Sequence, residues 1–146
     1  MPGVDPGFLL LYTRVAAYLR PDLADAVLTS AQILEQQGQL DLAAETFAKI
    51  PADSPLFHIA EMGRADTLIA SGKIDAGIEV LQTLTRSHAE LPAVHMALAD
   101  ALRTQERFAE SIAPYDEAIR RIGPPEPRHW AVFFARGISH ERNGDF

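Results

Sequence analysis

The sequence predicts an all-α protein, an α-solenoid in which antiparallel helical hairpins stack into a right-handed superhelix. Three observations predict this fold: classes of side chain recur every 34 residues, tight glycine turns separate the two helices of most units, and prolines mark helix starts. A single hairpin cannot bury its own apolar stripe, so each hairpin must stack on its neighbours. We therefore expect one domain built from repeats.

Six classes of side chain share a single register. They are Ala31, Ala65 and Ala99; Leu34, Leu68 and Leu102; Leu40, Ile74 and Phe108; Ala43, Gly77 and Ser111; Phe47, Leu81 and Tyr115; and Ile50, Leu84 and Ala118. Gly137 and Phe146 continue the first and third classes after a longer interval. The small residues let paired helices approach closely, and the large ones fill the space towards the next hairpin.

Tight turns divide each unit into two helices. Gly38, Gly72 and Gly144 stand in these turns, where glycine takes up the left-handed conformation that commonly ends a helix. Glu106 occupies the corresponding place in the remaining unit. Prolines follow at expected helix starts, where the missing N–H group costs no hydrogen bond. These prolines are Pro21, Pro55, Pro92 and Pro127, whereas Pro114 lies inside a helix and predicts a kink over residues 110–114.

The same register gives the domain organisation. Residues 1–146 form a single domain that divides into 7–20 (the second helix of a unit), three repeats at 22–55, 56–91 and 92–126, and 127–146 (the first helix of a further unit). Neither end has the polar outer face of a terminal repeat, because Leu9 and Leu10 lie near one end and Trp130 and Phe133 near the other. We expect an internal fragment of a longer protein, with end helices open to pairing with a second copy.

This pattern resembles the tetratricopeptide repeat (TPR) family, whose repeats of 34 residues combine small and bulky positions in the way that Ala31, Ala65 and Ala99 combine with Phe47, Leu81 and Tyr115. The resemblance covers nearly the whole chain and is closest to larger multi-repeat proteins of bacteria. It implies antiparallel helix-turn-helix hairpins. Several residues depart from the family pattern. Glu61, His95, Arg64 and Arg136 stand where a bulky apolar residue is usual, and Ile50 and Leu84 stand where a small one is usual.

Composition argues against several classes of function. The formal net charge is −7, with 20 acidic and 13 basic residues and no Lys/Arg run, which argues against nucleic acid as a partner and against an RNA-binding helical repeat. No apolar run approaches the ~20 residues of a membrane span, and no signal peptide is expected. Bacterial cytoplasm and periplasm both remain open, since the parent protein could be exported.

The sequence offers no support for catalysis. It contains no cysteine, and its histidines lack the spacing of a zinc site. Gly72-Lys73 lacks the preceding strand and earlier glycine of a phosphate-binding loop, and no two carboxylates are marked as a pair in a pocket. We therefore expect a protein that is not an enzyme and needs neither a metal nor another cofactor.

The resemblance also implies a binding groove, because the first helices of TPR units line a concave face. Carried onto this sequence, the candidate groove residues are Leu28, Gln32, Ile59, Met62, Asp66, Ile69, Met96, Asp100, Arg103 and Phe134. The Lys and Asn residues with which chaperone-binding members grip a terminal carboxylate are absent. Methionines suit an apolar helix or extended segment, and the carboxylates favour a basic one. Met62 and Met96 could equally serve only as packing residues between helices.

Two functions from different classes follow. The first is a protein–protein interaction scaffold that binds a peptide or helix of unknown identity in its groove. The alternative is a structural or self-associating spacer of a larger repeat protein, a homodimer whose groove is filled or unused.

Overall fold

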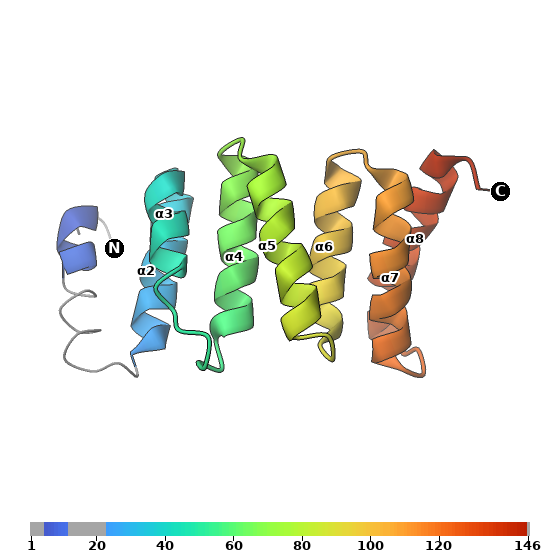
Figure 1. Cartoon of the computed structure of the whole chain (residues 1–146), viewed down its shortest axis with the longest axis horizontal. Helices are drawn as coiled ribbons and strands as arrows, with labels where there is room; N and C mark the ends of the chain where they lie inside the picture. The colour runs from blue at the N-terminus through green and yellow to red at the C-terminus, as the bar shows by residue number, and fades with distance from the viewer. Residues whose placement is uncertain (1–4, 12–22, 146) are drawn as a thin grey trace. The chain divides into compact units, whose positions relative to one another are not determined.

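A computed structural model describes residues 5–11 and 23–145, and every regular element within these ranges is helical (Figure 1). Residues 6–11 are helical, followed by α2 (Ala24–Gln36), α3 (Leu40–Phe47), α4 (Phe57–Ala70), α5 (Ile74–Ser87), α6 (Pro92–Thr104), α7 (Phe108–Ile122), the short 3-10 helix η1 (Pro127–His129) and α8 (Trp130–Asn143). The prediction of an all-α chain of helix-turn-helix hairpins is confirmed. The chain divides into two compact units, Met1–Gly77 and Ile78–Phe146.

The first unit is built around α2, α3 and α4. Val27, Ala31, Phe47, Ile50 and Ala60 form its core. Ala31 and Ala60 are fully buried, and their small side chains leave room for the ring of Phe47, which is 2% exposed. Burying an aromatic ring of this kind contributes about 1.5–3 kcal/mol relative to leaving it in water.

Gly63 sets the distance between α3 and α4. A Cβ atom at this position would lie 2.7 Å from Cζ of Phe47, closer than real side-chain contacts come. The ring cannot retreat easily, because it is buried in the core of the unit. The absence of a side chain at residue 63 is therefore what lets this helix pair close around Phe47.

The second unit contains α6, α7 and α8, with α8 lying beside α7 in Figure 1. Its core combines Ala99, Tyr115, Ala118 and Val132. A buried hydrogen bond of 2.8 Å joins the hydroxyl groups of Ser111 and Ser139, linking α7 to α8. Both serines are fully buried, and each hydroxyl also lies within hydrogen-bond distance of a carbonyl one turn earlier, Phe108 for Ser111 and Ala135 for Ser139, so both buried hydroxyls have partners.

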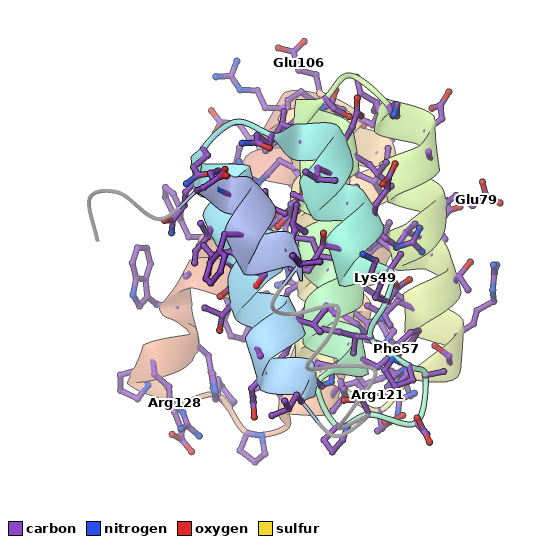
Figure 2. The ribbon with its side chains drawn as sticks, turned by 90° about the vertical axis from the view of Figure 1, so that its left-hand side faces the viewer. Lys49, Phe57, Glu79, Glu106, Arg121 and Arg128 are labelled. Carbon is purple, nitrogen blue, oxygen red and sulfur yellow. The ribbon has the colours of Figure 1, made fainter. Side chains whose placement is uncertain are left out.

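The turns after the first helices share one backbone pattern. In the turn after α2 the N–H of Gly38 bonds to the carbonyl of Glu35, and that of Gln39 bonds to the carbonyl of Leu34. The turn after α6 repeats this pattern, with Glu106 in the place of glycine at a φ of 59°. Its side chain projects from the turn in Figure 2. A residue with a Cβ atom adopts this conformation at a cost in free energy.

Prolines mark helix starts with one small difference from the prediction. Pro92 is the first residue of α6 and Pro127 the first of η1, whereas α4 begins two residues after Pro55 because the Ser54 hydroxyl accepts the N–H of Leu56 in a preceding turn. Helix α7 continues through Pro114 as one element, so the expected kink does not interrupt it. Pro21 and most of the predicted helix over residues 7–20 lie outside the described residues.

Glu61 and His95, two of the departures from the family pattern, both have polar partners. His95 is 7% exposed, and its Nε2 lies 2.8 Å from the backbone carbonyl of Ala89. The carboxylate of Glu61 accepts two hydrogen bonds, of 2.9 and 2.7 Å, from the guanidinium of Arg64 one turn away. These contacts replace the apolar packing that the family usually has at these positions.

The contact at residue 63 gives a testable prediction with an internal control. Gly63→Ala should lower the free energy of unfolding by about 1–3 kcal/mol, because overpacking against Phe47 outweighs the better helix propensity of alanine. Gly137→Ala in α8 should raise it by about 0.5–1 kcal/mol, because a Cβ there meets no atom within 4 Å. Urea unfolding of both variants measures the difference. An unchanged or raised stability in Gly63→Ala would contradict the assigned contact.

Candidate partner-binding site

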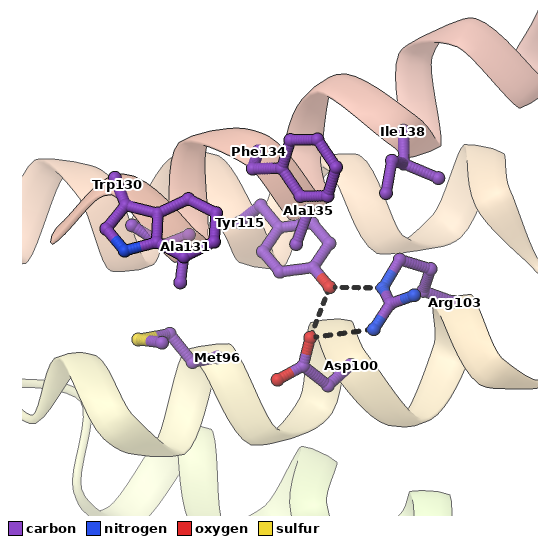
Figure 3. Close-up of a pocket in the computed structure, with 10 residues that line it drawn as sticks. Met96, Asp100, Arg103, Tyr115, Trp130, Ala131, Phe134, Ala135 and Ile138 are labelled. Atoms are coloured by element: carbon purple, nitrogen blue, oxygen red, sulfur yellow. Dashed lines mark hydrogen bonds and ion pairs between the residues drawn. The ribbon is translucent and has the colours of Figure 1, made fainter.

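The second unit contains an open pocket of about 300 Å³ between α6 and α8 (Figure 3). Its lining residues are Met96, Asp100 and Arg103 from α6, Tyr115 from α7, and Trp130, Ala131, Val132, Phe134, Ala135 and Ile138 from α8. Met96, Asp100 and Arg103 follow one face of α6 at helical spacing. The pocket thus combines a polar side on α6 with an apolar side on α8.

Two exposed aromatic rings form much of the apolar side. Trp130 is 66% exposed and Phe134 is 62% exposed, although residues of this size are usually buried. Their ring centroids lie 5.9 Å apart with the ring planes tilted by 54°. One helical turn separates the two residues, so α8 presents both rings on the same face. Such a pair offers a partner a large apolar surface that needs no rearrangement of the helix.

A chain of hydrogen bonds forms the polar side. Arg103 Nε donates to the hydroxyl of Tyr115 at 2.9 Å, and that hydroxyl donates to Oδ1 of Asp100. Arg103 Nη2 also lies 3.6 Å from the same oxygen. Figure 3 shows the other oxygen of Asp100, Oδ2, pointing away from Arg103. Within the described residues Oδ2 has no hydrogen-bond partner.

The surroundings of Tyr115 keep its phenol group protonated. Burial of the side chain, and then its hydrogen bond to Asp100, raise the pKa of Tyr115 to about 12. The hydrogen bond to Tyr115 also raises the pKa of Arg103, so the guanidinium stays charged. The phenol is therefore a fixed donor that holds Asp100 Oδ1 in place.

The ten sequence-predicted groove residues fall into two groups. Met96, Asp100, Arg103 and Phe134 come together in this pocket. The other six lie in the first unit: Leu28 and Gln32 on α2, and Ile59, Met62, Asp66 and Ile69 on α4. Leu28 is half-buried against the core of that unit, while Gln32, Ile59 and Asp66 are exposed. A role for these six in binding stays a prediction.

Tyr115, Trp130 and Val132 line the pocket, although their places in the repeat do not predict it. Tyr115 belongs to the class of large residues that fill the space between hairpins, and its hydroxyl also reaches the pocket. The sequence does contain one indication of this second role, because Tyr115 has a hydroxyl group that the equivalent residues Phe47 and Leu81 lack. The preceding helix α6 carries Asp100 and Arg103 as polar partners for this hydroxyl group.

A second pocket, of about 380 Å³, lies in the first unit. It is lined by Asp41, Ala44, Glu45, Ala48, Arg64, Leu68 and Lys73. The ammonium of Lys73 is paired with Asp41 at 2.8 Å, and Arg64 is paired with Glu61. These cations are already engaged, and the pocket has no exposed aromatic ring, so it is a weaker candidate site.

The described residues hold no group of three His, Asp or Glu side chains placed to bind a metal ion. In the same ranges, the helices are too short or too polar to cross a membrane.

The helical hairpins of this chain share one pattern of turn and one pattern of packing. These features place the chain in the class of helical-repeat proteins. Residues 62–127 match the family model described as tetratricopeptide repeat, so this part of the chain carries tetratricopeptide repeats. Proteins with this fold generally act as non-catalytic scaffolds with protein partners. No curated relative matches the sequence.

Solved structures share the fold at low sequence identity. A structure of MamA from strain AMB-1 is 22% identical, with a TM-score of 0.62 over 83% of this chain and 69% of that one. MamA from Desulfovibrio magneticus RS-1 is 16% identical, with a TM-score of 0.68 over 96% and 77%. A kinesin light chain structure from Podospora anserina with nearly identical TPR-like repeats is 16% identical, with a TM-score of 0.71 over 86% and 68%.

The Tyr115 network predicts a specific dependence of stability on pH. Since the pKa of the phenol is raised in the folded state, its contribution is full below pH 10 and is lost as pH rises towards 12. Tyr115→Phe should cost about 1–2 kcal/mol at neutral pH, because Asp100 and Arg103 each lose a partner. Denaturant unfolding below pH 10 and near pH 12 should show a steeper loss in the wild type than in the variant. Parallel curves would contradict the assignment.

Proposed function

We propose that this protein is an interaction scaffold that holds a peptide or helical segment of a partner in the groove on its first helices, and that the pocket between α6 and α8 is the main contact within the second unit. The exposure of Trp130 and Phe134 beside a polar wall is the observation that carries the proposal. Interfaces take much of their binding energy from aromatic anchors of this kind. No catalytic step is assigned to the site.

The shape of the pocket favours a segment of protein over a small molecule. It is open to solvent and lined by residues of α6 and α8 with Tyr115 of α7, so a bound segment does not have to be enclosed. A mainly apolar wall with a few fixed polar groups is typical of surfaces that take an amphipathic helix or extended peptide. Half-buried Met96 adds an adaptable side chain at the floor.

The proposal predicts that peptides selected from a random displayed library will depend on Phe134. Binding of those peptides should weaken about tenfold or more in Phe134→Ala, since removing a buried phenylalanine contact costs about 1.5–3 kcal/mol. Phe8→Ala is the matched control, because Phe8 has the same chemistry and is 61% exposed in the first unit. Trp130 is the only tryptophan, so its fluorescence can report binding. Equal affinity for the two variants would refute the proposed site.

Self-association is the second candidate function, and the same exposed rings favour it. Trp130 and Phe134 could pack against those of a second copy and remove apolar surface from water in both. In that case sedimentation across a concentration series should show a dimer that Phe134→Asp converts to monomer. A wild type that stays monomeric at high concentration would remove this candidate and leave the pocket free for a partner.

A further inference from the structure

We propose that the pocket between α6 and α8 recognises a lysine side chain of the partner segment, with its ammonium on Oδ2 of Asp100 and its aliphatic stem between Trp130 and Met96. This inference rests on the proposed function and names the chemistry of what the site accepts. It has three supports: a carboxylate oriented by its neighbours, aromatic faces beside it, and a single acceptor oxygen left open.

The first support is the fixed orientation of Asp100. Its side chain is 47% exposed, yet Oδ1 accepts the hydroxyl hydrogen of the fully buried Tyr115. Arg103 holds that hydroxyl in turn through Nε. The carboxylate therefore does not have to be ordered when a ligand binds, which removes part of the entropic cost of forming an ion pair.

The second support is the surface next to Oδ2. In Figure 3 Trp130 and Met96 stand on the side of Asp100 opposite to Arg103. The faces of exposed aromatic rings attract cations, and tryptophan does so most strongly. The four methylene groups of a lysine side chain can lie along such rings and the methionine while the ammonium reaches a carboxylate.

The third support separates lysine from arginine. A guanidinium gains most from a carboxylate when both oxygens accept its two parallel N–H groups. Here Oδ1 already accepts from Tyr115 and lies 3.6 Å from Arg103 Nη2, so a second guanidinium would meet a used acceptor and a like charge. A compact ammonium needs only the one open oxygen.

An acidic side chain fits the pocket poorly. It would approach the Asp100 carboxylate and the electron-rich faces of Trp130 and Phe134. Arg103 could attract it, but that guanidinium already donates to Tyr115 and neighbours Asp100. The chain as a whole carries a formal net charge of −7, which also favours a basic partner.

The test uses short host peptides, acetylated and amidated, with a leucine at each end and one variable central residue. The central residue is lysine, arginine, norleucine or glutamate, and binding is followed by Trp130 fluorescence. The lysine peptide should bind about tenfold more tightly than the norleucine peptide, about threefold more tightly than the arginine peptide, and most tightly of the four. Its advantage over norleucine should shrink as salt is raised.

Variants separate the pocket carboxylate from the overall charge. Asp100→Asn should reduce lysine binding to the level of norleucine. Asp75→Asn removes one negative charge from an exposed position of α5 and should leave the preference unchanged. Tyr115→Phe frees Oδ1 and should narrow the difference between lysine and arginine. Circular dichroism and thermal unfolding confirm that each variant is folded before its affinities are compared.

Several outcomes would overturn the inference. Equal binding of lysine and norleucine would define a purely apolar pocket, tightest binding of glutamate would assign the site to Arg103, and no binding of any host peptide would remove lysine as an occupant. The proposed function is judged separately, because library-selected peptides that depend on Phe134 would support it in each of these cases. If the host peptides show no preference for lysine and the library-selected peptides do not depend on Phe134, the pocket is not a binding site.

Discussion

The close approach of paired helices is the constraint on which the rest of the structure depends. It requires positions with almost no side chain: Ala31 and Ala99 are fully buried in the two units, and Gly63 leaves the space that the ring of Phe47 occupies. Larger residues at these places would force the helices apart and open the cores. The same closeness brings α6, α7 and α8 near enough for Asp100, Tyr115 and Trp130 to share one pocket.

Much of this fold could be read from the sequence because it depends on local signals that recur. Turn glycines, prolines at helix starts and alternating small and large side chains all act within a few residues of their position. Glu106 shows how far such reasoning holds, since the turn there forms with the same backbone hydrogen bonds despite the missing glycine. Cooperative packing of the flanking helices overrides one unfavourable residue.

The candidate site was less accessible to sequence reasoning. Repeat position alone grouped Met96, Asp100 and Arg103 with residues of the first unit, because it assigns the same role to every equivalent position. The polar side of the pocket depends on one hydroxyl group, because Tyr115 both fills the core and holds Asp100. A repeat pattern treats this residue as apolar bulk, so its second role appears only in three dimensions. The division of the chain into repeats at 22–55, 56–91 and 92–126 stays a proposal.

The turn at Glu106 has a consequence for how this protein could change. A left-handed residue with a Cβ atom stores roughly 1 kcal/mol of backbone strain, which glycine would release. Replacing Glu106 by glycine would therefore raise the stability of the fold at a surface position that touches neither the core nor the pocket. A later substitution that weakens Asp100 or Tyr115 while altering what the pocket accepts could be offset at this turn. The one turn among those after α2, α4, α6 and α8 that lacks glycine is therefore where the loss of stability that accompanies a new binding specificity could most easily be offset.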